Sequence, residues 1–395
     1  MRSHHFLFIS LICVFLLLCV ACNSAPEQSA EPTPPDEETQ LSSKEDNPIK
    51  ASAETLLSSM TLEDKIYQLF FVTPEALTDM GCVTAAGETT KNAIKSRPIG
   101  GVIYFAKNFE TPAQTKDMLS GIQSFSRIPL FLAVDEEGGR VSRLGANSAM
   151  NFPHLPPMGT IGSSDDTGKA YDAGLTIGRA LFDLGFNVDF APVADVLIHP
   201  NNTEIGDRSF SADPQLNASM VSAFTKGLKE TGIAPTLKHF PGHGATVNNS
   251  HLGRTESTRT LDQMRTSELL PFISGIEAGA DFIMVSHLTA TQISDKPCTL
   301  SSEIMTNLLR TELGYEGIII TDSMQMGAIT DSYTSGEAAV MALSAGADMI
   351  LMPYSLTDAV QGVKNAVEKG TLSEYTINEK VYRILNIKEK YNLLP

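Results

Sequence analysis

Eight short runs of apolar and β-branched residues recur along the chain, and the segments between them carry apolar residues at helical spacing. The predicted strands are Gln68–Val72, Gly101–Phe105, Leu130–Val134, Asn187–Phe190, Pro235–His239, Asp281–Ser286, Gly317–Thr321 and Asp348–Met352. The predicted helices include Thr167–Leu184, Pro214–Thr231, Leu261–Gly279 and Ser302–Leu313. Alternating strands and helices form parallel sheets, and eight such units can close into a barrel. We therefore predict an α/β fold with a single (β/α)8 barrel of the TIM type; an open doubly wound sheet is the alternative.

The residues that precede the barrel have the composition of an export signal and a tether. A basic start is followed by an apolar run, Phe6–Ala21, and then by Cys22. This run is shorter than the roughly 20 residues that a spanning helix needs. Small residues directly before a cysteine resemble a bacterial lipoprotein cleavage site. We therefore expect a signal peptide at 1–21, a lipidated Cys22, a disordered acidic linker at 22–50 and a globular barrel at 51–395, in an extracytoplasmic protein whose only membrane attachment is its lipid. Ordinary secretion is the alternative.

Charge and cysteine content narrow the possible partners. The formal net charge of −17 argues against a nucleic-acid partner and against a basic patch on anionic lipid. No G-x-G-x-x-G motif follows the first predicted strand, so a bound dinucleotide is not expected. We expect no metal and no other cofactor. Beyond the leader only Cys82 and Cys298 remain, too few for a disulfide framework.

Polar residues follow several of the predicted strands directly. In a (β/α)8 barrel the chemistry lies at the C-terminal ends of the strands. We therefore expect one shared site at the barrel mouth, formed by Asp135, Asp195, Lys238, His239, His287 and Asp322. Such convergence indicates an enzyme.

Each of these stretches also has a simpler structural interpretation. Asp322 could be a nucleophile, or it could cap the N-terminus of the next helix. His239, His243 and His251 could bind a metal, but Pro241-Gly242 makes a shared helical face improbable, and hydrogen bonding within a rigid loop is an alternative. The charged loop from Asp135 to Arg143, and Arg208 in a later loop, could bind a ligand or form internal salt bridges.

Three motifs together resemble glycoside hydrolase family 3, in its bacterial β-N-acetylglucosaminidase branch. They are D-x-E-G-G-R-V-x-R-L from Asp135, K-H-F-P-G-H-G from Lys238, and T-D-S-M around Asp322. The similarity extends from Met60 to the final helices, so it covers the whole globular region. It implies a catalytic barrel in which Asp322 is the nucleophile and His251 the general acid/base. By the same resemblance, the contacts to the bound sugar are Asp135, Arg143, Arg208, Lys238 and His239.

One position departs from the family pattern. The branch typically has an aspartate two residues before the acid/base histidine, and here that residue is Asn249. An amide can orient an imidazole but cannot stabilise an imidazolium by charge.

We expect a retaining exo-β-N-acetylglucosaminidase that removes terminal N-acetylglucosamine from peptidoglycan fragments or related aminosugar oligosaccharides. A phosphorylase for the same sugar, and a weakly active or inactive surface lipoprotein that binds muropeptides, are the alternatives. We expect the barrel to supply the whole site.

Overall fold

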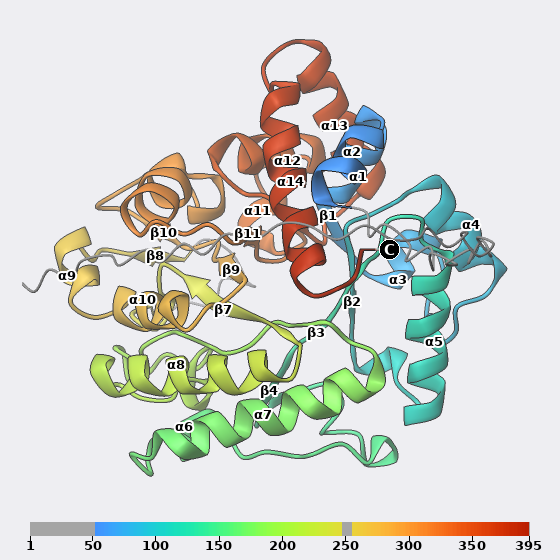
Figure 1. The fold of residues 1–395 in the computed structure, drawn as a ribbon. Coiled ribbons are helices and arrows are strands. Elements are labelled where there is room, and N and C mark those ends of the chain that lie inside the picture. Colours follow the sequence, from blue (N-terminus) through green and yellow to red (C-terminus); the bar gives the residue numbers. More distant parts are fainter. Residues whose placement is uncertain (1–51, 247–254, 395) are drawn as a thin grey trace, which may run out of the picture. The chain divides into compact units, whose positions relative to one another are not determined.

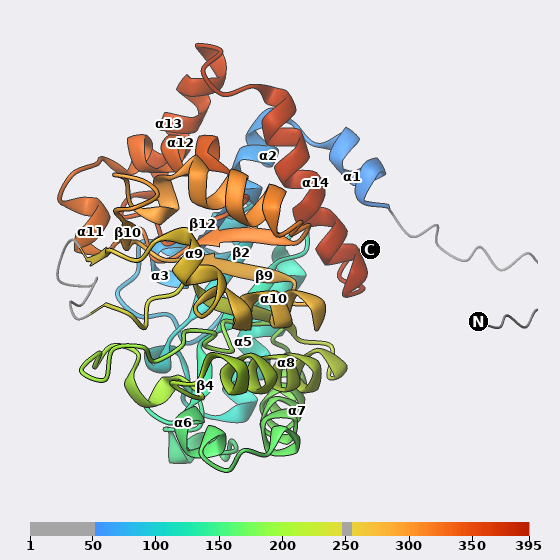
Figure 2. The same ribbon diagram turned by 90° about the vertical axis from the view of Figure 1, so that its left-hand side faces the viewer.

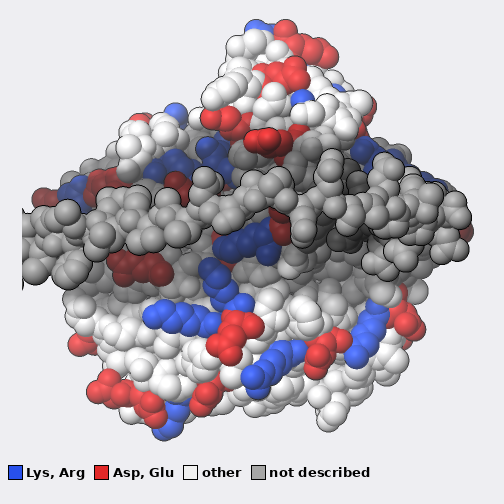
Figure 3. Space-filling view, viewed as in Figure 1, with Lys and Arg blue, Asp and Glu red and all other residues white. Residues whose placement is uncertain are grey.

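The computed structural model describes residues 52–246 and 255–394. The predictions for the signal peptide, for Cys22 and the linker, and for Asn249 and His251 concern residues outside these ranges. Figure 1 shows the fold, and Figure 2 shows it from the side. On the face shown in Figure 3, positive and negative side chains of the described residues are interspersed.

Eight parallel strands form the centre of the fold. They are β1 (Phe70–Val72), β2 (Gly101–Tyr104), β3 (Phe131–Val134), β6 (Val188–Asp189), β7 (Ala234–Phe240), β9 (Phe282–Val285), β11 (Ile318–Thr321) and β12 (Ile350–Leu351). Their order in the sheet is β11-β9-β7-β6-β3-β2-β1-β12. A parallel bridge between Ile320 and Met349 joins the two ends of this sheet. The predicted barrel, with its eight strands, is therefore confirmed.

Aromatic side chains fill the barrel. The ring of Phe131 on β3 lies 5.1 Å from that of Phe282 on β9, and Phe71 on β1 lies 5.4 Å from Phe190. These strands are not neighbours in the sheet, so the contacts cross the interior. Lys388, which is completely buried, places its Nζ 5.0 Å from the Phe131 ring centre and donates to Gln68 Oε1 at 2.7 Å. The interior is thus a packed core and not a channel.

Helices surround the barrel (Figures 1 and 2). They are α1 (Ala53–Ser59), α2 (Leu62–Gln68), α3 (Pro74–Thr78), α4 (Glu88–Ser96), α5 (Pro112–Phe125), α6 (Met158–Gly162), α7 (Thr167–Leu184), α8 (Pro214–Glu230), α9 (Leu261–Arg265), α10 (Leu269–Glu277), α11 (Gly327–Thr330), α12 (Ser335–Ala345), α13 (Leu356–Glu368), α14 (Glu374–Lys390) and a π-helix, Glu303–Glu312. Two short pairs, β4 (Glu136–Gly138) with β5 (Val141–Ser142) and β8 (Glu256–Ser257) with β10 (Thr289–Ala290), lie outside the barrel. Within the described residues, no helix is both long and apolar enough to span a membrane.

The predicted helix Leu261–Gly279 is two helices. Pro271 lies in the first turn of α10, where a missing N–H costs nothing. In one continuous helix its ring would clash with the preceding turn. The chain therefore ends α9 at Arg265 and begins α10 at Leu269. Cys82 and Cys298 are both free thiols.

Candidate active site

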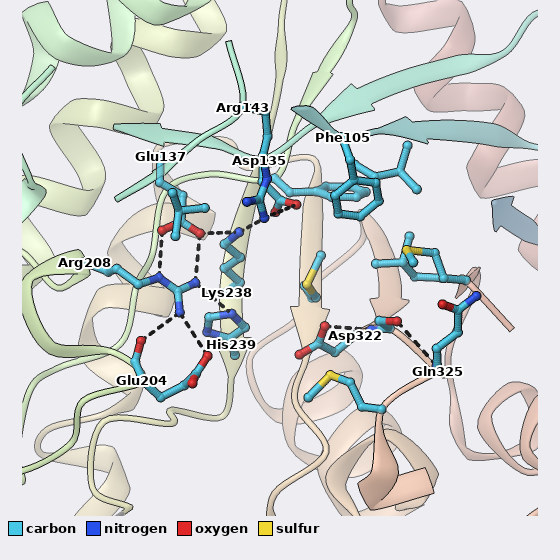
Figure 4. A pocket seen from close by; sticks show the side chains of 18 residues that line it. Phe105, Asp135, Glu137, Arg143, Glu204, Arg208, Lys238, His239, Asp322 and Gln325 are labelled. Atoms are coloured by element: carbon cyan, nitrogen blue, oxygen red, sulfur yellow. Dashed lines mark hydrogen bonds and ion pairs between the residues drawn. The ribbon is translucent and has the colours of Figure 1, made fainter. Parts of the chain in front are cut away.

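A cavity of about 450 Å³ lies at the C-terminal ends of the barrel strands. Figure 4 shows the side chains that line it. Six of the predicted site residues are among them: Asp135, Arg143, Arg208, Lys238, His239 and Asp322. Apolar side chains on the strands or directly after them, such as Phe190, Met284 and Leu351, also line the cavity. The convergence predicted at the barrel mouth is therefore present for four residues, Asp135, Lys238, His239 and Asp322. Arg143 and Arg208, expected only as sugar contacts, line the same cavity.

A chain of alternating charges forms one side of the cavity. In order, its members are Arg143, Asp135, Lys238, Glu137, Arg208 and Glu204. Lys238 Nζ lies 2.7 Å from Asp135 Oδ1 and 2.6 Å from Glu137 Oε1. Arg208 donates two hydrogen bonds of 2.8 Å to Glu137. The interpretation of these loops as internal salt bridges is confirmed. The paired charges also face the cavity, and ligand binding by them stays a prediction.

Glu137 is an inner member of this charge chain, and no sequence pattern singled it out. Its side chain is 2% exposed. Burial alone would raise its pKa, but Arg208 and Lys238 outweigh burial and hold the pKa of Glu137 well below its usual range. Burial likewise would lower the pKa of Lys238, and Asp135 and Glu137 raise it instead. The carboxylate and both cations therefore remain charged at neutral pH.

The loop that carries Arg143 folds back on a buried carboxylate. Glu136 Oε2 accepts hydrogen bonds from the backbone N–H groups of Arg143 and Leu144, both at 2.8 Å. Gly138 and Gly139 form the turn with φ of 81° and 57°, values that favour glycine. The guanidinium carbon of Arg143 lies 5.5 Å from the ring centre of Phe105, and both side chains line the cavity. The backbone hydrogen bonds to Glu136 thus hold the loop, while the guanidinium of Arg143 pairs with Asp135 at 3.7 Å.

A second loop, after β6, brings in Arg208 and Glu204. Arg140 holds this loop, since its Nη2 donates to the carbonyl oxygens of Thr203 at 2.8 Å and Glu204 at 2.6 Å. Its Nε donates to Asp207 at 3.1 Å. Arg140 does not line the large cavity, yet it fixes the backbone from which two lining residues project.

Asp195 orients the imidazole ring of His239. Asp195 is completely buried and accepts from His239 Nδ1 at 2.6 Å and from the backbone N–H of His243 at 2.6 Å. Burial would raise the pKa of Asp195, but His239 outweighs it and lowers that pKa. Arg208 Nη2 lies 3.4 Å from His239 Nε2, and because a guanidinium can only donate, Nε2 accepts. This assigns the proton of the ring to Nδ1.

Two predicted members of the site, Asp195 and His287, do not line the cavity. Asp195 acts through His239, as described above. His287 is buried, with Nδ1 2.8 Å from Thr299 Oγ1 and Nε2 2.8 Å from the carbonyl oxygen of Ser323. His287 therefore supports the backbone next to Asp322. His243 is buried and bonds Thr246 within its own loop at 3.1 Å, as the simpler interpretation held.

Asp322 lines the cavity apart from the charge chain (Figure 4). It follows β11, and its backbone N–H donates to the carbonyl of Val285 on β9 at 2.9 Å. Its Oδ1 accepts from the N–H of Ser323 at 2.7 Å. The next helix, α11, begins only at Gly327 and has Met326 as its N-cap, so the helix-cap interpretation of Asp322 is wrong. A carboxylate fixed at a strand end and facing a cavity is suited to nucleophilic attack.

No group of three or more His, Cys, Asp or Glu side chains that could hold a metal ion occurs within residues 52–246 and 255–394. His239 and His243 have ring centres 6.1 Å apart, and both engage Asp195 through the contacts above.

Comparison with known proteins adds a family and several relatives. The model of the glycosyl hydrolase family 3 N-terminal domain matches residues 61–387. The chain is 33% identical over 319 residues to beta-hexosaminidase A of Pseudoalteromonas piscicida, which covers 74% of the chain and 53% of that protein. It is 33% identical over 279 residues to a beta-hexosaminidase of Xanthomonas oryzae pv. oryzae (strain MAFF 311018), covering 67% of the chain and 80% of that protein.

A solved structure is similar over most of the barrel. It is a glycoside hydrolase family 3 beta-N-acetylglucosaminidase from Paenibacillus sp. str. FPU-7, with a TM-score of 0.79 and 33% sequence identity. The alignment covers 85% of this chain and 63% of the Paenibacillus chain. The chain therefore spans only about half to two thirds of the length of some of its relatives.

Proposed function

The chain belongs to glycoside hydrolase family 3, and from that premise we propose that it is a retaining β-N-acetylhexosaminidase that removes a terminal N-acetylglucosamine. The observation that carries this proposal is the placement of Asp322 at the end of β11, facing a cavity that also presents a chain of paired charges. The names of its relatives among beta-hexosaminidases support the sugar class.

In the proposed reaction, Asp322 attacks the anomeric carbon of the bound sugar and forms a glycosyl ester. The bond to the leaving oxygen breaks, and that oxygen takes a proton from a general acid. Water then gives up a proton to the same group and attacks the anomeric carbon, which releases Asp322 as a carboxylate. We assign the acid/base role to His251 by family resemblance; this residue lies outside the described ranges.

The charge chain would recognise the sugar hydroxyls. Asp135 offers acceptor oxygens, and Arg143 and Lys238 offer donors, at 16%, 31% and 2% side-chain exposure. The donors of Arg208 are largely committed to Glu137 and to the carbonyl of Glu204. We therefore assign Arg208 a smaller share of direct sugar contact than the family resemblance implies. The aromatic core closes the floor of the cavity, and we propose exo action on the family resemblance.

We propose peptidoglycan fragments or related aminosugar oligosaccharides as the natural substrates. We also propose export and lipid anchoring through Cys22, on the composition of residues 1–50. A Cys22→Ser variant should then move from the membrane fraction to the soluble fraction of its cells.

The test is hydrolysis of a chromogenic N-acetyl-β-glucosaminide, with and without phosphate. Wild-type protein should release the chromophore, and Asp322→Ala should lower turnover by at least about a thousandfold. The unfolding temperature of the variant should stay close to that of the wild type. Phosphate-dependent release would support the phosphorylase alternative, and binding without turnover would support the muropeptide-binding alternative. Wild-type activity in Asp322→Ala would exclude Asp322 as the nucleophile.

A further inference from the structure

A second groove lies beside the catalytic cavity, on the outer side of the loops that follow β11 and β12. Its volume is about 430 Å³. It is lined by two tyrosines, Tyr333 and Tyr354, by four serine and threonine side chains, and by Asp358. Tyr354 is 76% exposed, the most exposed large hydrophobic side chain among the described residues. An aromatic ring beside polar side chains in a hollow offers a face on which an apolar ligand surface can stack.

The groove and the catalytic cavity border the same two loops. In the loop after β12, Met352 lines the cavity and Tyr354, two residues later, lines the groove. In the loop after β11, Met326 lines the cavity and Thr330 lines the groove. Since two residues of extended chain span only about 7 Å, the two hollows are close neighbours on the same face of the barrel.

Backbone contacts orient the polar groups of the groove. Ser335 Oγ accepts from the N–H of Ser355 at 3.0 Å, and Ser355 Oγ accepts from the N–H of Asp358 at 3.2 Å. Asp358 Oδ2 accepts from the N–H of Gly336 at 2.9 Å. Within the described ranges, neither serine donates its own hydroxyl proton, and Asp358 Oδ1 accepts no hydrogen bond. The groove therefore presents two oriented donors and one acceptor next to an aromatic face.

The charge of the groove favours a neutral ligand. The helices α12 and α13 both begin here, with Thr334 and Ser355 as N-caps, and a helix N-terminus attracts anions. However, the first turns of these helices already contain Glu337 and Asp358. An anionic ligand would meet these carboxylates, whereas a pyranose offers an apolar face to an aromatic ring and hydroxyls to the polar groups.

We propose that this groove binds a neutral sugar unit of an oligosaccharide substrate, on the reducing side of the bond that is cleaved. This inference rests on the proposed function, because an end-on sugar in the catalytic cavity must leave its remaining units at the mouth. The groove then distinguishes long substrates from short ones.

The test compares kcat/KM for a β-1,4-linked hexamer of N-acetylglucosamine with kcat/KM for the chromogenic monoglycoside. Tyr354→Ala should lower this ratio by roughly three- to tenfold, the range for loss of one aromatic contact. Tyr375→Ala is the matched control, since Tyr375 is 70% exposed on α14, outside the groove. It should leave the ratio at the wild-type value. A ratio for Tyr354→Ala within twofold of the wild type overturns the proposal.

A binding measurement separates this result from the proposed function. Calorimetric titration of the hexamer into Asp322→Ala, with and without Tyr354→Ala, needs no turnover. If the wild type cleaves neither substrate, the proposed function fails, and the titration still decides whether Tyr354 contributes to binding. Equal affinity of Asp322→Ala and of the double variant for the hexamer overturns the proposal that the groove binds a sugar unit.

Discussion

Replacing Glu137 with glutamine should destabilise the fold strongly at neutral pH. The buried carboxylate makes three contacts of 2.6 to 2.8 Å with Arg208 and Lys238. A glutamine keeps one acceptor oxygen, but its amide N–H groups face donors. One or two charge-assisted hydrogen bonds are then lost, at about 1.5–3 kcal/mol each. Two buried cations also lose a partner, and removing one member of a buried ion pair costs about 3–5 kcal/mol. We expect a loss of about 3–5 kcal/mol in the free energy of unfolding.

The pH dependence of this loss follows from the lowered pKa of Glu137. A carboxyl whose pKa is lower in the folded state stabilises the fold at pH values above its unfolded pKa of about 4.3. That contribution disappears as the pH falls toward the folded pKa. The difference between wild type and Glu137→Gln should therefore be constant from pH 8 to 5 and become smaller below about pH 4.

The assay is urea unfolding followed by circular dichroism, because the chain has no tryptophan. Asp183→Asn, an exposed carboxylate on α7, is the control and should change stability little. Two results would refute strong coupling of Glu137 to Arg208 and Lys238. One is a loss of unfolding free energy below about 1 kcal/mol at pH 7, and the other is a loss that stays the same down to pH 3.

Three further predictions concern other parts of the molecule. Arg140→Ala should raise KM roughly three- to tenfold with little change in kcat, because Arg140 positions the loop with Glu204 and Arg208 through hydrogen bonds; steady-state kinetics checks this, and an equal fall in kcat would contradict it. Burial lowers the pKa of Lys388 well below its usual value, so the unfolded state binds a proton that the folded state does not, and stability should rise with pH toward about 10.4. Urea unfolding at pH 7, 8 and 9 gives the increase of the unfolding free energy per pH unit, and Lys388→Met should reduce this increase by up to about 1.4 kcal/mol. An unchanged increase would mean that Lys388 is charged in the folded protein. Asn249→Asp should raise activity, more for a natural disaccharide than for an aryl glycoside with a good leaving group; equal or lower activity on both would mean that the loop positions its proton donor differently.

The barrel could be predicted because its signals are local. Each strand is a short apolar run that ends at polar residues, and the chain repeats this unit eight times. The boundary of α7, Thr167–Leu184, was predicted to the residue because Asp166 caps its start and Gly185 follows its end with φ of 101°. The break between α9 and α10 is signalled by Pro271. The helical spacing of the apolar residues continues through this break and so does not reveal it.

The site was predictable only where residues follow strands. Glu137 was not predicted as a site residue, although an extended chain places residues two apart on the same side of the strand. Asp135 and Glu137 have that relation, so alternation through β4 could have found it. Glu204 had no such signal, because it comes from an irregular loop whose path depends on contacts with Arg140, 63 to 65 residues away in the sequence.

Exposure along the charge chain is graded, and this affects how the site could be redesigned. The outer members, Arg143 and Glu204, have side chains 31% and 21% exposed, whereas Lys238 and Glu137 are at 2%. A change at an inner position leaves two neighbours of like charge facing each other in a buried setting, so a tolerated variant there would need compensating changes made together. The outer residues can be replaced one at a time, because solvent screens the charge that is left without its partner. Natural variation and directed evolution of substrate preference should therefore accumulate first at Arg143 and Glu204.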